Sequence, residues 1–257
     1  MSDSREQSAI RNRLLAALPS DEYEQLRPHL ELIHLPKGKI IYRAGDIVRY
    51  GYFINDGQCS LLSVTEEGTT LEIAMVGNEG AIGLPIIWRK NKTTCEVMVQ
   101  IPCRSAYRIK AEALRTEFDR GGRLQDLLLR YTEVLVTQIT QSAVCNHFHT
   151  SAQRLARRLL IANDLVGSDT FYLTHEFISH MLGAPRTAVT MAAGTLQKTG
   201  LITYSRGRIT ILDRSGLETA SCECYKIIRE SFDHYLDAEE TNTMGHPETA
   251  LRHKGGR

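Results

Sequence analysis

The stretch LGAPRTAV, at positions 182–189, contains a glycine, a proline and an arginine in an order that suggests a binding function. Gly183 permits a tight backbone turn, and Pro185 suits the first position of a helix because its missing N–H would be unpaired there. The helix that follows then presents Arg186 at its exposed start. An arginine can pair with O6 and N7 of guanine through two hydrogen bonds, a contact worth about 1–3 kcal/mol of base discrimination.

This second helix has two faces. Helical spacing places Val189, Ala193 and Leu196 on the buried side. Four residues on the other side are expected to face base edges: Arg186, Thr187, Thr190 and Met191. Contacts to phosphates are expected from residues around the helix: Thr174, His175, Lys198, Arg206 and Arg208.

The elements around this stretch must position it. Thr174 is a good N-cap for the preceding helix. Another amphipathic helix is expected at 151–164, with its leucines on one face and three arginines toward solvent: Arg154, Arg157 and Arg158. After the second helix, LITYSRGRITILD is typical of a β-hairpin with its tip at 206–208. The order helix, helix, turn, helix, hairpin predicts a winged helix-turn-helix, whose second helix enters the DNA major groove.

Two packed core helices with a solvated Arg186 are the alternative interpretation of this segment. The hairpin argues against it, because a tip that carries two arginines has no obvious packing role.

The N-terminal half has a different pattern. Two short helices are expected at 9–18 and 21–29, followed by short alternating segments with glycine turns about every ten residues, which predict an all-β sandwich or barrel. Between Ile40 and Ile109 there is no histidine, so a metal-dependent enzyme built on such a roll would lack its usual ligands. We therefore expect no catalytic residues and no enzyme activity.

A long helix follows at about 121–148. Alternating steps of four and three residues connect Leu124, Leu128, Tyr131 and Leu135, which is the spacing of a coiled coil. This stripe predicts the seam of a homodimer. A helix packed in the core of one chain would explain its first half equally well.

The cysteines form no CxxC pair. Cys145, His147 and His149 make a CxHxH group at the end of the long helix, and Cys222 and Cys224 make a C-x-C. Zinc or copper chemistry is conceivable for the first group. However, side chains at i, i+2 and i+4 do not share one helical face, and the second pair suits core packing of the terminal helix. We expect no metal and no cofactor, and a role for either group stays open.

Composition sets broad limits. The chain has 257 residues, 42% of them hydrophobic, which excludes a purely disordered protein and suits one or two domains. Its 31 basic and 30 acidic residues nearly balance, so affinity for nucleic acid must come from a local patch. We find no signal peptide and no membrane-length apolar run, and we expect a cytoplasmic protein with no membrane contact.

Five features in this order resemble the Crp/Fnr superfamily of bacterial transcription regulators: KGKIIYRAGD, YFINDGQCSLL, GNEGAIG, the long helix, and LTHEFISHMLGAPRTAVTMAAGTLQKTGLITYSRGRITIL. The resemblance covers residues 10–236. It implies an α+β fold with a β-roll sensor domain (a double-stranded β-helix like that of cyclic-nucleotide-binding domains), a dimerisation helix and a DNA-binding winged helix. It also implies binding to double-stranded DNA, a homodimer and contact with RNA polymerase.

Two departures limit the resemblance. In members that bind cyclic AMP the recognition helix resembles R-E-T-V-G-R, whereas this chain has Thr187 and Met191 in place of the glutamate and the last arginine. The operator should therefore differ. Such members also hold the nucleotide with a glutamate and an Arg-Ser pair, but here the corresponding positions are Ile82, Gly83, Thr94 and Cys95. An effector pocket is expected at these four residues, and cyclic AMP binding is not expected, because the phosphate would lack its cation.

The sequence thus predicts four parts: the roll with its N-terminal helices at 1–120, the dimerisation helix at 121–148, the winged helix-turn-helix at 149–236, and a disordered tail at 237–257. It predicts a sequence-specific transcription regulator that binds a pseudo-palindromic operator and responds to an unidentified signal. A cyclic-nucleotide-responsive or a redox- or metal-responsive regulator of the same architecture is the alternative.

Overall fold

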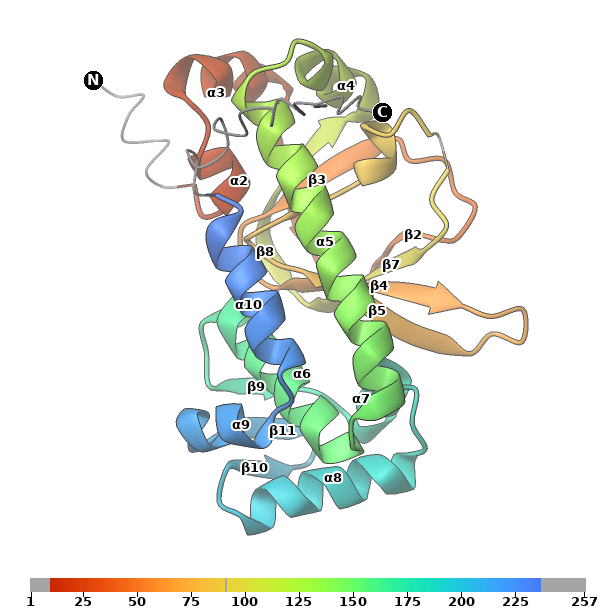
Figure 1. Ribbon diagram of the computed structural model, residues 1–257. Coiled ribbons are helices and arrows are strands. Elements are labelled where there is room, and N and C mark those ends of the chain that lie inside the picture. Colours follow the sequence, from red (N-terminus) through yellow and green to blue (C-terminus); the bar gives the residue numbers. More distant parts are fainter. Residues whose placement is uncertain (1–9, 91, 237–257) are drawn as a thin grey trace, which may run out of the picture.

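The computed structural model describes residues 10–90 and 92–236. Its upper half is a roll of two four-stranded sheets, and its lower half is a smaller helical domain with a three-stranded sheet (Figure 1). The long helix α5, Arg123–Phe148, runs across both halves. The predicted α+β class, with its roll, long helix and winged helix-turn-helix, is confirmed.

The roll consists of antiparallel strands with two short helices before them. One sheet has the order β1-β8-β3-β6 and the other β2-β7-β4-β5. Residues of both sheets share one hydrophobic core, which includes Phe53, Cys59 and Val99. The elements are α2 Arg13–Ala16, α3 Ser20–Leu26, β1 Glu31–Leu35, β2 Ile40–Tyr42, β3 Tyr50–Ile54, β4 Gln58–Val64, β5 Thr70–Val76, β6 Ala81–Ile82, β7 Glu96–Ile101, β8 Cys103–Lys110 and α4 Ala111–Asp119.

The C-terminal half is built around the helix-turn-helix. Its three-stranded sheet has the order β10-β11-β9, and its hydrophobic core includes one residue of the roll, Met75 of β5. Phe232 packs against this core and against that of the roll. The elements are α6 Ser151–Val166, β9 Thr170–Tyr172, α7 His175–Leu182, α8 Arg186–Lys198, β10 Ile202–Ser205, β11 Arg208–Ile211, α9 Arg214–Ala220 and α10 Cys224–His234. The predicted tail at 237–257 lies outside the described residues.

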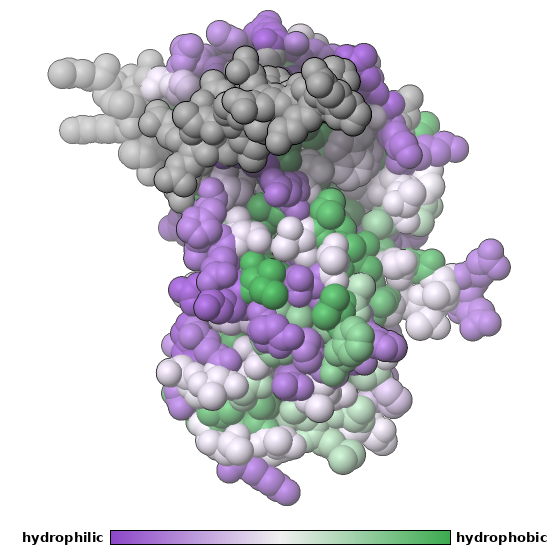
Figure 2. Space-filling view, in the orientation of Figure 1, coloured by the Kyte–Doolittle hydropathy of each residue, from purple (hydrophilic) through white to green (hydrophobic). Residues whose placement is uncertain are grey.

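The prediction of which face of α5 forms a dimer seam is wrong. Leu124, Leu128, Tyr131 and Leu135 are at most 5% exposed, because they belong to the core of the roll within one chain. An apolar stripe at coiled-coil spacing fits either location, and here α5 packs it against its own sheets. A different face of the helix is open, where Leu129 and Val136 are 51% and 56% exposed. Figure 2 shows hydrophobic side chains along the middle of this face, over α5.

The prediction that the arginines of α6 point to solvent is also wrong. Arg154, Arg157 and Arg158 are 8%, 6% and 2% exposed, because α6 lies between the roll and the rest of the winged helix. The Arg158 guanidinium is paired with Glu72 of β5: Nε lies 2.8 Å from Oε1, and Nη2 donates a hydrogen bond to Oε2 at 3.1 Å. This buried ion pair joins the two halves of the molecule.

Within residues 10–90 and 92–236, no helix combines the length and apolar character that crossing a membrane requires.

Candidate nucleic-acid interface

The turn between α7 and α8 is built by local interactions. The Thr174 side chain accepts a hydrogen bond from the N–H of Phe177 and so caps α7. Gly183 has φ +54°, the left-handed conformation that ends helices at low cost in glycine. Pro185 is the N-cap of α8, one position before the place predicted for it, so Arg186 is the first helical residue.

Helix α8 has one buried and one open face. Val189, Ala193 and Leu196 are at most 4% exposed, as helical spacing predicts. The four predicted base-reading residues are all exposed and lie within the first two turns: Arg186, Thr187, Thr190 and Met191. Met191 is 74% exposed, which is unusual for so large an apolar side chain and offers a contact for a thymine methyl group.

Arg186 is held by an ion pair with Glu176 of α7, with Nη2 2.8 Å from Oε1. Both side chains are well exposed, and such surface pairs contribute about 0.2–1 kcal/mol. A bidentate contact to guanine is worth about 1–3 kcal/mol. A contact of that strength would be enough to displace Glu176 from Arg186. Nothing in the sequence indicates this competing carboxylate, because the pairing joins two different helices.

The hairpin of β10 and β11 forms the wing. Its tip, Arg206 and Gly207, has positive φ at both positions (+50° and +79°), as a tight hairpin turn of type I′ requires. Both Arg206 and Arg208 are exposed, and neither forms an ion pair with any residue that the structure describes. They line a shallow groove of about 300 Å³ together with Tyr172 of β9, which pairs with Arg208 across the sheet.

The other predicted phosphate contacts border this face. Thr174 is exposed at the N-terminus of α7, and His175 is the first residue of that helix. Lys198 is exposed at the opposite end of α8 from Arg186, so the length of this 13-residue helix separates it from the predicted base-reading residues. The structure thus gathers the predicted DNA-contacting residues on α7, α8 and the wing.

The four residues of the predicted effector pocket line one cavity of about 180 Å³ in the roll: Ile82, Gly83, Thr94 and Cys95. None of the described residues around it has a charged side chain. Leu135 and Ile139 of α5 and the roll residue Trp88 complete its apolar wall. These three could not be placed there from the sequence, because the spacing of Leu135 suits a dimer seam equally well and no local pattern shows which residues of α5 face the roll.

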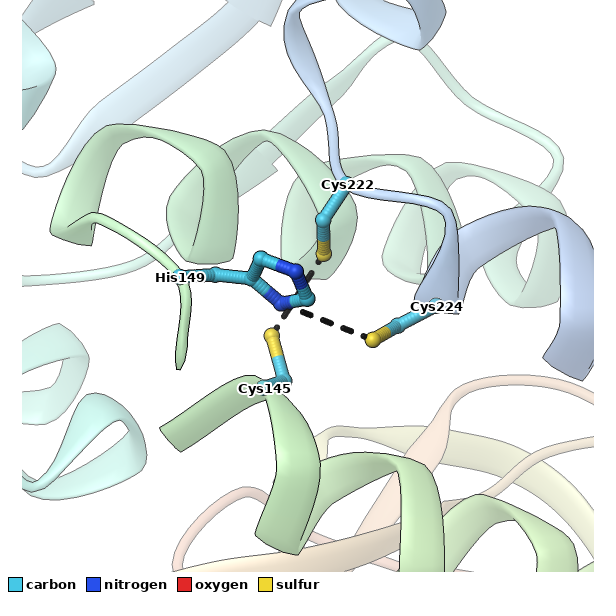
Figure 3. A group of neighbouring side chains, drawn as sticks. All are labelled: Cys145, His149, Cys222 and Cys224. Atoms are coloured by element: carbon cyan, nitrogen blue, oxygen red, sulfur yellow. Dashed lines mark hydrogen bonds between the residues drawn. The ribbon is translucent and has the colours of Figure 1, made fainter. Parts of the chain in front are cut away.

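A second group of reactive side chains lies at the lower end of α5. Cys145, His149, Cys222 and Cys224 have ligand atoms within 4.8 Å of one another (Figure 3). A hydrogen bond with Cys222, and to a lesser extent the nearby Arg157, lowers the pKa of Cys145 to about 5. His147, which the sequence grouped with Cys145, is exposed and stacks edge-on against Phe148 instead.

Two family models match the sequence. A cyclic nucleotide-binding domain matches residues 32–120, and a Crp-like helix-turn-helix domain matches residues 153–220. No curated protein matches the sequence.

Several solved structures share the fold. FixK2 from Bradyrhizobium japonicum is 17% identical with a TM-score of 0.65, over 75% of this chain and 98% of that one. A Crp/Fnr-family protein from Eubacterium rectale is 22% identical with a TM-score of 0.62, over 80% and 96%. The c-di-GMP-responsive global regulator CLP from Xanthomonas campestris is 14% identical with a TM-score of 0.64, over 76% and 100%.

Proposed function

Because the chain belongs to the Crp/Fnr family of transcription regulators, we propose that it acts as a homodimer that places one α8 helix in the major groove of each half-site of a pseudo-palindromic operator. Its activity is DNA binding through the helix-turn-helix rather than catalysis. The observation that carries the proposal is the open face of α8 beside the arginine-tipped wing. Half-sites about one helical turn apart would match such a dimer.

Arg186, Thr187, Thr190 and Met191 are proposed to read bases. Their exposure on the first two turns of α8 supports this role, because a recognition helix contacts base edges with its N-terminal residues. Arg206 and Arg208, with Thr174, His175 and Lys198, are proposed to contact phosphates. These contacts fix the position of the protein on DNA without selecting a sequence.

A comparison of two arginine variants tests this division. Arg186→Ala should relax the preference at one base pair per half-site, at a cost of about 1–3 kcal/mol for the preferred site. Arg206→Ala should weaken binding to all sequences alike. It should also make the affinity for DNA less sensitive to salt, by the amount expected for the loss of about one phosphate contact. In-vitro selection of bound DNA with both variants measures the difference. An unchanged preference in Arg186→Ala would contradict the recognition role.

The dimer is proposed to form through the open face of α5. Leu129, Val136 and Ala143 are exposed and recur every seven residues, which keeps them on one face of a supercoiled helix pair. Val136→Glu should therefore give a monomer in sedimentation analysis. Leu32→Glu is the matched control, because Leu32 is equally apolar and exposed but lies on β1. A Val136→Glu protein that stays dimeric would refute this seam.

The cavity in the roll is proposed to hold the signal, and its apolar wall favours a small uncharged molecule over a nucleotide. A cyclic phosphate would need a cation there to replace its hydration. A molecule bound in the cavity would contact α5 directly, since Leu135 and Ile139 of this helix line the cavity. Titration with cyclic AMP should leave operator affinity unchanged, and strong stimulation would overturn this part of the proposal.

As a transcription regulator, the protein is further proposed to act in the cytoplasm and to contact RNA polymerase.

A further inference from the structure

Three cysteines and one histidine meet at the joint between the long helix and the winged helix. Cys145 lies in the last turn of α5, and His149 follows that helix as its C-cap in extended conformation. Cys222 lies in the loop after α9, and Cys224 is the first residue of α10. Figure 3 shows the four side chains converging on one point from these separate segments.

The spacing of the four donor atoms suits a single ion. The Sγ atoms of Cys145 and Cys222 are 3.5 Å apart, and Sγ of Cys224 is 3.6 Å from Nδ1 of His149. A zinc–sulfur bond of about 2.3 Å places the sulfurs at tetrahedral corners about 3.8 Å apart. An iron–sulfur cluster is larger than one ion and would need more widely separated sulfurs.

A buried cation beside the group indicates that it carries negative charge. Arg157 is 6% exposed, and its Nε and Nη1 atoms have no hydrogen-bond partner among the described residues. It interacts electrostatically with all three sulfurs. Burying such a charge is costly unless an opposite charge compensates it. Three thiolates, one neutral imidazole and one Zn²⁺ have a net charge of −1, which would compensate the buried positive charge of Arg157.

The histidine is also oriented as a ligand. Its Nδ1 faces the sulfurs, while Nε2 lies 3.2 Å from Oε1 of Glu223. Metal-binding histidines commonly donate their second ring N–H to a carboxylate, which fixes the ring and raises its basicity. Glu223 lies between the two cysteines of the C-x-C, so one three-residue segment at the start of α10 supplies two sulfurs and the carboxylate.

We propose that Cys145, His149, Cys222 and Cys224 bind one Zn²⁺ ion in tetrahedral coordination. The cysteines bind as thiolates, those that still carry a proton release it to solvent as the ion binds, and histidine binds as the neutral imidazole. The ion joins the end of α5 to the start of α10 and so fixes the angle between the long helix and the winged helix. If the three thiols served only apolar packing, the chain would bind no zinc. A Cys145–Cys222 disulfide would instead remove two of the four ligands.

Metal content of the full chain tests the site. Protein purified in reducing buffer without chelator should contain one zinc per chain by elemental mass spectrometry. Cys224→Ser should lose most of it, whereas Cys95→Ser should retain it, since Cys95 lies in the roll. Glu223→Ala should weaken zinc binding about tenfold or more. A wild-type chain without zinc that also fails to take it up would overturn the proposal.

Cobalt provides a readout that does not depend on loss of folding. The metal-free chain with Co²⁺ should develop the visible bands of tetrahedral cobalt thiolate. Cys222→His keeps four ligands, so it should still bind one cobalt with bands altered by the loss of one sulfur. Identical bands in both proteins would exclude Cys222 as a ligand. A Cys145–Cys222 disulfide in the reduced preparation would refute the site altogether.

The consequence for DNA rests on the proposed function. If the ion fixes the joint, its removal should weaken operator binding while leaving thermal unfolding of the roll unchanged. Equal affinity with and without zinc would overturn this orienting role and leave the metal site intact. Failure to bind DNA in either state would instead contradict the proposed function.

Discussion

The buried carboxyl of Glu79 should make the stability of the protein depend on pH in an unusual way. It follows β5 and is 3% exposed, with Oε1 accepting a hydrogen bond from the N–H of Gly77 at 2.9 Å. Its Oε2 is buried without a hydrogen-bond partner in the described chain. Burial raises the pKa of this carboxyl from 4.5 to about 7, against a smaller opposing contribution from the hydrogen bond of Gly77.

The sign of the effect is opposite to that of most carboxylates. Between pH 4.5 and 7 the folded chain keeps a proton on Glu79 that the unfolded chain releases. The free energy of unfolding therefore falls as pH rises through this window and levels off above it. At about 1.4 kcal/mol per pH unit, the loss is about 3 kcal/mol.

Glu79→Gln should remove this loss, because the amide is neutral at every pH and similar in shape. Its free energy of unfolding relative to wild type should rise by about 3 kcal/mol between about pH 4.5 and 8, measured by urea denaturation. Glu66→Gln is the control, since Glu66 is exposed in the turn between β4 and β5. Parallel stability curves for wild type and Glu79→Gln would refute the reasoning.

Three further predictions concern the stability of the folded chain. Arg158→Ala leaves Glu72 buried without its partner and should lower the free energy of unfolding by about 3–5 kcal/mol. Replacing both residues, Arg158→Leu with Glu72→Leu, should lower it much less. Equal losses for the two proteins in urea denaturation would show that the pair is not coupled. Gly80→Ala should lower the melting temperature, because its Cβ would clash with the Tyr131 hydroxyl, at a cost of about 1–3 kcal/mol. Gly194→Ala in α8, where a Cβ meets nothing within 4 Å, should raise the melting temperature through helix propensity. A higher melting temperature for Gly80→Ala would contradict the first expectation, and a lower one for Gly194→Ala would contradict the second.

The helix-turn-helix could be predicted because its signals are local. A threonine cap, a glycine with positive φ, a proline and an arginine-tipped hairpin each act within a few residues, and their order alone identifies the motif. The resemblance to cyclic-nucleotide-binding members of the family implied that Ile82, Gly83, Thr94 and Cys95 share one pocket, and they line one cavity. The apolar nature of the cavity did not, because residues from α5 complete it.

Periodicity and turn chemistry were enough to predict the kinds of element, their order and the exposed face of α8, since these depend on short stretches of sequence. Three features could be seen only in the folded chain: the open face of α5, the burial of three arginines of α6, and the contact of Cys145 with Cys222, 77 residues later. Helical periodicity shows that a stripe is apolar but not which surface covers it. Long-range packing makes that choice, and here it converts a predicted seam into core and two separate cysteine motifs into one four-residue cluster.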